Sequence, residues 1–192
     1  MNLKRMFLIL ILLLVTNCIA RVDYSRIEPQ NIYSIHRVLN VSVVSNDLFF
    51  KESTRTSVSK WNRFLGKEVF NYESSFLSSS RFEYLVLVFD GSEQSRCLER
   101  QDVLAYTIAH VDFKDGHAKG GRIFLCRNQI LFNKATGKEV TLEGVIVHEL
   151  GHILSTGHFK ESNILHPYKT FVYPSYFDNY VLIPAIKDKI KF

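Results

Sequence analysis

The segment HELGHILSTGH combines three histidines and a glutamate at spacings that suit a metal site. On an α-helix, residues four apart lie on one face, so His148 and His152 can direct their imidazoles at the same ion. Glu149 would lie beside that ion, where a carboxylate can act as general base. His158 would supply the third ligand after the chain turns back beyond the helix. Three neutral imidazoles with one open position are typical of a catalytic zinc site.

A bare His-Glu-x-x-His pattern also arises by chance in helices. Here it lies within TLEGVIVHELGHIL, residues 141–154, for which the sequence predicts a strong helix. Thr141 can serve as its N-cap, and Val145 and Ile153 belong to its apolar surface. A capped apolar helix, followed by a third histidine ten residues after the first, favours the zinc interpretation.

Further elements must position this helix. Strands are predicted where β-branched and apolar residues run together, at residues 36–44, 82–91, 103–113 and 121–132. Apolar positions between Asp47 and Leu65 recur at helical spacing, which predicts a helix that ends at Gly66. Residues 159–192 are rich in aromatics and predict an irregular C-terminal lobe with a short helix at 184–190. This order of elements predicts one α+β domain.

The N-terminus has the layout of a secretory signal peptide, with Lys4 and Arg5 before an unbroken apolar run and a small residue at its end. Residues 1–20 are therefore predicted to be a signal peptide, and residues 21–192 the single catalytic domain. The apolar run is too short for a comfortable transmembrane helix. The residues before Cys18 are similar to a lipobox, so a lipoprotein signal ending before Cys18 stays open. Either alternative predicts a secreted, periplasmic or cell-surface protein, attached to a membrane only through Cys18.

Composition narrows the function classes. With 192 residues, 46% of them hydrophobic, the chain can form one domain with a real core. The net charge of +5 is mild and its basic residues are scattered, which argues against nucleic-acid binding. We expect a monomer. After export, Cys97 and Cys126 remain as an even pair, and they could form a disulfide or stay as two buried thiols.

Other polar residues are also candidates for a site. His110, Asp112 and His117 could suggest a second metal, but no fourth ligand has clear spacing, so polar residues on a solvated hairpin are expected instead. A second metal ion is therefore not expected. His166 could line a cleft and Tyr168 could donate a hydrogen bond to an oxyanion, although a surface position and aromatic packing are the simpler expectations.

HELGHILSTGH is similar to the metzincin signature His-Glu-x-x-His-x-x-Gly-x-x-His, and most of all to its matrixin branch. NILHP, residues 163–167, stands where matrixins carry the Met-turn. SVSKWNRF around Trp61 is similar to the first helix of that fold, and GGRIFL, residues 120–125, resembles the edge strand beside the substrate cleft. Only the active-site segment is a specific match; the rest agrees at the level of pattern.

The resemblance implies an exported zinc-dependent endopeptidase in which His148, His152 and His158 hold one catalytic zinc ion and Glu149 is the general base. It also implies a mixed twisted sheet with an antiparallel edge strand, an active-site helix and a small irregular C-terminal lobe. A protein or peptide substrate would lie extended against residues 121–126 by β-augmentation. The alternative is a catalytically weak or inactive metzincin-like surface-anchored binding protein, which would have no need for the general base.

Two positions depart from the signature. Ser155 stands in place of a glycine, and a serine forced to positive φ would cost on the order of 1 kcal/mol. Gly157 could relocate that turn. Leu165 stands in place of the Met-turn methionine, and its similar volume predicts that it keeps a packing role. Neither departure removes a ligand or the base.

Overall fold

The computed structural model describes residues 32–74, 84–91, 94–99, 103–112, 114–135, 140–155, 157–159, 162–166 and 172–192. The predicted signal peptide, including Cys18, and Tyr168 lie outside the described residues. Within the described part of the chain, no helix combines the length and the apolar character that crossing a membrane requires.

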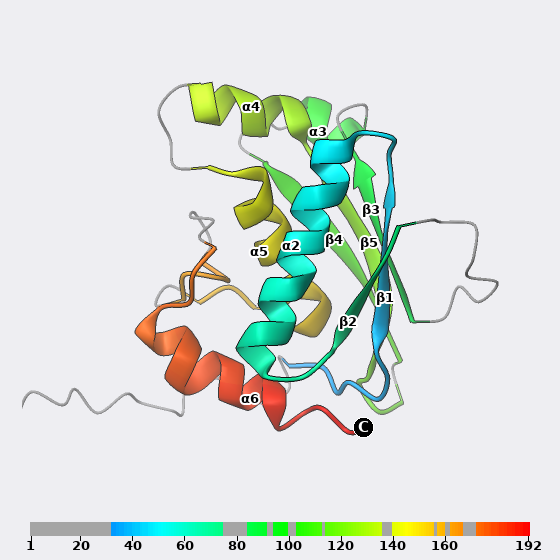
Figure 1. Ribbon diagram of the computed structural model, residues 1–192, viewed down its shortest axis with the longest axis vertical. Coiled ribbons are helices and arrows are strands. Elements are labelled where there is room, and N and C mark those ends of the chain that lie inside the picture. The colour runs from blue at the N-terminus through cyan, green and yellow to red at the C-terminus, as the bar shows by residue number, and fades with distance from the viewer. Residues whose placement is uncertain are drawn as a thin grey trace, which may run out of the picture.

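The described strands form one five-stranded mixed sheet (Figure 1). They are β1 (Leu39–Val44), β2 (Phe70–Glu73), β3 (Leu85–Asp90), β4 (Ala105–Val111) and β5 (Ala118–Leu125), in the spatial order β2-β1-β3-β5-β4. Neighbours pair in parallel except for β4, which is antiparallel to β5. The structure is therefore a mixture of helices and a mostly parallel sheet with an antiparallel edge strand, which is compatible with the predicted α+β class.

The prediction that GGRIFL forms the edge strand is wrong, because β5 lies between β3 and β4. Its glycines let both neighbours come close. A Cβ on Gly121 would lie 2.5 Å from the Ile108 carbonyl oxygen and 2.7 Å from Ile153 Cδ1, and a Cβ on Gly120 would overlap the Leu85 carbonyl. Side chains at these two positions would push the neighbouring strand or helix away, so the glycines serve an interior strand. The antiparallel edge is β4.

The two long helices begin and end close to where their sequences indicate. Helix α2 (Leu48–Leu65) starts at Asp47, whose side chain accepts a 2.9 Å hydrogen bond from the Phe49 amide, and it ends at Gly66 with a φ of 66°. Helix α5 (Leu142–Leu154) starts at Thr141, whose hydroxyl accepts a 3.0 Å bond from the Gly144 amide. The structure therefore confirms both predicted helices, and their ends lie at the capping residues that the sequence indicates.

Helices α2 and α5 lie side by side on one side of the sheet (Figure 1). Trp61 of α2 is fully buried, and its indole N–H donates a 2.8 Å hydrogen bond to the Val147 carbonyl of α5. Apolar side chains of α5, such as Leu150 and Ile153, are fully buried in the same core as Ile123 of β5. The face of α5 that carries the histidines is thus held in place by packing on its other faces.

The expected strand over residues 121–132 is only half right. Strand β5 ends at Leu125, and helix α4 (Arg127–Ala135) follows at once. Leu125 pairs with the last residue of β3, Asp90, and with the first residue of β4, Ala105. Beyond it no strand partner remains in register, so the backbone satisfies its hydrogen bonds within a helix instead. Strand β2 and helix α3 (Ser95–Glu99) were not predicted, because segments this short carry too little periodicity.

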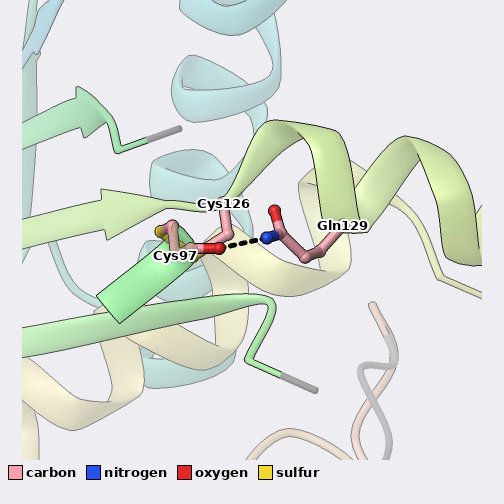
Figure 2. The surroundings of a disulfide bond; sticks show 3 residues. All are labelled: Cys97, Cys126 and Gln129. Carbon is pink, nitrogen blue, oxygen red and sulfur yellow. Dashed lines mark hydrogen bonds between the residues drawn. A yellow bond between two sulfur atoms is a disulfide. The ribbon is translucent and has the colours of Figure 1, made fainter. Parts of the chain in front are cut away.

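Cys97 of α3 and Cys126, between β5 and α4, form a disulfide with their Cα atoms 5.3 Å apart (Figure 2). The Gln129 side-chain amide donates a hydrogen bond to the Cys97 carbonyl beside it. Of the two alternatives that the sequence leaves open, the structure therefore has the disulfide. It connects the short helix α3 to the end of a buried strand.

The end of the chain is more helical than expected. A π-helical turn, η4 (Asp178–Leu182), continues into α6 (Ile183–Lys187), so the helix begins before Pro184 rather than at it. A π turn is rare and occurs mostly as a single turn within an α-helix, as it does here. It places Asp178, which is fully buried, against the segment at residues 162–166.

Candidate metal centre

The structure brings together the three histidines that the sequence singles out. The Nε2 atoms of His148, His152 and His158 lie 3.1 Å from one another in all three pairs. His148 and His152 occupy successive turns of α5, and His158 approaches from beyond the helix end. Tetrahedral bonds of about 2.05 Å to a zinc ion would place neighbouring ligand nitrogens about 3.3 Å apart. The triangle therefore has the size and the ligand chemistry of a three-histidine zinc site.

Electrostatics keep these imidazoles neutral. Burial, together with the neighbouring His152 and His158, lowers the pKa of His148 to about 3. Burial and His158 lower the pKa of His152 to about 4, and burial also lowers the pKa of His158. Neutral imidazole is the form that binds a metal, so the site is ready for an ion at neutral pH without having to release protons from these rings.

A backbone carbonyl sets the orientation of His148. Its Nδ1 lies 2.8 Å from the Ile164 carbonyl oxygen, and a carbonyl can only accept, so Nδ1 carries the proton and Nε2 presents a lone pair to the site. The next residue, Leu165, is fully buried and packs against α5: a Cβ on Gly151 would lie 2.6 Å from Leu165 Cδ2. Leu165 thus has the packing role that its volume predicts.

Asp178 holds the turn that carries this carbonyl, a role that no pattern in the sequence indicated. Its carboxylate accepts hydrogen bonds from the Ser162 hydroxyl and from three backbone amides, those of Asn163 at 2.8 Å, Ile164 at 3.3 Å and Ser175 at 2.7 Å. A fully buried carboxylate with four donors is well satisfied. The turn, and with it the partner of the His148 ring, is therefore fixed from the C-terminal helix.

Glu149 is buried beside the triangle, with 6% of its surface exposed. Burial raises its pKa to about 7, in spite of a hydrogen bond from Thr107 that acts in the opposite direction. The Thr107 hydroxyl donates to Glu149 Oε2 at 2.6 Å, from the edge strand β4. The carboxylate is thus held between helix and edge strand with a pKa near the value that suits a general base. Sequence inspection missed Thr107, because its contact depends on how β4 packs against α5.

Ser155 carries no backbone strain. Its φ of −154° and ψ of 146° are extended values that any residue adopts, so the penalty considered for a positive φ does not arise. The position forms an antiparallel bridge with Ile32, and the Tyr33 amide donates a 3.0 Å bond to the Leu154 carbonyl. At Ser155 the chain thus leaves the helix in an extended conformation, along the segment at residues 32–33.

The other polar residues that the sequence suggested as site candidates do not join the histidine triangle. His110 is exposed on β4, and Asp112 pairs with Lys119 at 2.8 Å. His117 is buried and stacks on His36 instead, so the three residues His110, Asp112 and His117 do not form a cluster. His166 lies near enough to the triangle for its charge to lower the pKa of His148 and His158.

No family model and no curated protein matches this chain.

Proposed function

We propose that the chain is an exported zinc-dependent endopeptidase with a matrixin-like metzincin catalytic domain. The observation that carries the proposal is the convergence of three histidine Nε2 atoms at 3.1 Å beside a buried glutamate. Zinc suits this ligand set better than magnesium or calcium, which prefer oxygen ligands. A mixed sheet with an antiparallel edge strand next to the histidine helix supports the metzincin assignment.

Each residue of the site has a role in peptide hydrolysis. His148, His152 and His158 would hold the ion, which supplies Lewis acidity that acidifies a water molecule and polarises a carbonyl group. Glu149 would take a proton from the attacking water and transfer it to the leaving amine. Thr107 would keep the Glu149 carboxylate oriented through its 2.6 Å hydrogen bond. The Ile164 carbonyl would keep the His148 ring in the tautomer that binds metal.

The substrate would lie along β4 rather than along residues 121–126. Strand β4 is the edge of the described sheet on the side of α5, whereas β5 already pairs on both sides. An extended peptide that adds to this edge would run past Thr107, and so past Glu149. Extended binding at the edge would therefore bring a scissile bond towards the carboxylate.

Metal analysis and a peptide-cleavage assay on the purified protein test this function. We expect a zinc ion that the His148→Ala variant fails to retain, and cleavage that Glu149→Gln abolishes while zinc stays bound. Glu52→Gln, an exposed glutamate of α2 paired with Arg55, is the matched control and should cleave normally. The proposal would be overturned if the purified protein contained no zinc and chelators had no effect on its peptide cleavage. Bound zinc without any cleavage by the wild type would favour the alternative, a metzincin-like binding protein.

A further inference from the structure

The face of the sheet that is turned away from α5 carries a row of stacked aromatic rings. Thr107 of β4 points towards Glu149 of α5, so its neighbour Tyr106 points to the opposite face. There the Tyr106 ring stacks on Phe124 of β5 with centroids 4.9 Å apart, and Phe124 stacks on Phe89 of β3 at 5.1 Å. These spacings match the separation of about 4.8 Å between neighbouring strands, so each strand adds one ring to the row.

The guanidinium group of Arg96 continues this row beyond the edge strand. Its Cζ atom lies 5.0 Å from the centroid of the Tyr106 ring. Phe124 already covers one face of that ring, so Arg96 covers the other face, on the side where the described sheet ends at β4. The distance is again close to one strand separation. Arg96 therefore occupies the place that the side chain opposite Tyr106 would take in a strand added to β4.

The disulfide fixes the backbone that carries Arg96. Arg96 directly precedes Cys97, and the bond from Cys97 to Cys126 holds the short helix α3 at the end of β5 (Figure 2). The hydrogen bond from Gln129 to the Cys97 carbonyl adds a second attachment. Cys97 is fully buried, whereas Arg96 is exposed. The guanidinium group is thus brought to the edge by a fixed backbone, while its own side chain can move to meet a ligand.

The charges on this side of the edge are positive. Strands β4 and β5 contain no aspartate or glutamate. Arg122 of β5 pairs with Ile108 of β4, is exposed, and lies on the same face as Phe124, two residues along the strand. Within the described part of the chain, neither Arg96 nor Arg122 forms an ion pair, and Glu99 of the same short helix does not pair with Arg96. The edge therefore presents positive charge that is complementary to a carboxylate.

We propose that Arg96 selects peptide substrates with an aspartate or glutamate at the residue that pairs with Tyr106. The inference rests on the proposed peptidase function and on addition of the substrate to β4. Side chains of an added strand alternate between the two faces, so the substrate residue that passes Thr107 faces the site, and its neighbour faces Arg96. That neighbour must displace the guanidinium group from the Tyr106 ring. Only a carboxylate gains a charge-assisted hydrogen bond to the guanidinium in exchange, whereas a lysine or arginine meets a like charge.

Cleavage of a synthetic peptide library by the zinc-loaded full chain tests the inference, with the products identified by mass spectrometry. We expect aspartate and glutamate to be enriched at one position within about three residues of the scissile bond, because the residue opposite Tyr106 is next to the one that passes Thr107. Three internally quenched peptides that differ only by Glu, Gln or Lys at that position then give values of kcat/KM. The wild type should prefer the Glu peptide over the Gln peptide about fivefold.

Variants of Arg96 separate recognition of charge from a structural role. The ratio of kcat/KM for the Glu and Gln peptides should fall to about one in Arg96→Gln and stay raised in Arg96→Lys, and Arg96→Glu should prefer the Lys peptide. Arg63→Gln, an exposed arginine of α2, is the matched control and should keep the wild-type ratio. Each ratio is measured within one variant, so differences in the amount of folded enzyme cancel.

The outcomes distinguish this inference from the function on which it rests. Cleavage without acidic enrichment, or a ratio that Arg96→Gln leaves unchanged, would overturn the role of Arg96 and leave the peptidase proposal intact. If the zinc-loaded wild type cleaved no peptide of the library, the proposed function would be overturned, and the inference with it.

Discussion

The hydrogen bond from Thr107 to Glu149 offers a sharp test of how the site works. Thr107→Val removes the hydroxyl and retains the shape and β-branching of the side chain, so strand β4 should keep its structure. The 2.6 Å bond is made to a buried carboxylate, and hydrogen bonds to charged groups contribute about 1.5–3 kcal/mol. That energy favours the ionised form of Glu149, which is the form that acts as base.

Loss of the bond should therefore raise the pKa of Glu149. Burial already brings this pKa to about 7 while the bond acts to lower it. Since one pKa unit corresponds to 1.36 kcal/mol, the variant should titrate about one to two units higher. At the pH where Glu149 is half ionised in the wild type, about one tenth or less would be ionised in the variant. We expect kcat/KM at that pH to fall by at least about fivefold on this account.

The assay is the pH dependence of kcat/KM for wild type, Thr107→Val and Thr107→Ser. The acid limb of the Thr107→Val profile should move to higher pH, and its activity should approach that of wild type in alkaline buffer. Thr107→Ser retains the hydroxyl and should follow the wild-type profile. An unmoved acid limb, or a loss of the same size at every pH with zinc still bound, would refute the assigned role of Thr107.

Three further predictions concern stability and metal affinity. Replacing Cys97 and Cys126 by serine removes a disulfide that closes a loop with a sequence separation of 29, and so increases the conformational entropy of the unfolded chain. The free energy of unfolding, measured by urea denaturation, should fall by about 3.5 kcal/mol. A loss below about 1 kcal/mol would contradict this entropic explanation. Asp178→Asn should lower the free energy of unfolding by about 1–3 kcal/mol, because an amide donor replaces one of the carboxylate oxygens that accept from the turn orienting His148. The same change should weaken zinc binding about 10–100-fold, as measured in competition with a chelator. Unchanged affinity would show that this turn does not act on the metal. The folded-state pKa of Glu149 is raised, so its contribution to stability is present below the unfolded pKa and is lost as the pH rises through about 7. Metal-free Glu149→Gln should therefore be more stable than wild type at pH 8, by up to about 3 kcal/mol, and no more stable at pH 4, as measured by thermal unfolding.

Local sequence determined the elements that carry the candidate site. Residues four apart on a helix share a face whatever surrounds them, so the spacing of His148 and His152 on α5 could be interpreted directly. The ends of helices depend on side chains only a few residues away, which is why Asp47 and Gly66 marked α2 correctly. His158 was predicted as the third ligand because the chain can turn back beyond the helix, and the resemblance of the segment to a known signature pointed to the same residue.

Tertiary structure alone decided which of these elements meet. GGRIFL has the composition of a strand, but its interior place in the sheet follows from β3 and β4 closing on its glycines from both sides. Thr107 reaches Glu149 only because β4 packs against α5 in one register, and Asp178 reaches the turn at Ile164 only through the fold of the C-terminal helix. Such contacts join residues far apart in the chain, and sequence periodicity reports only which face of an element is apolar. It holds no information on which other face that element will meet.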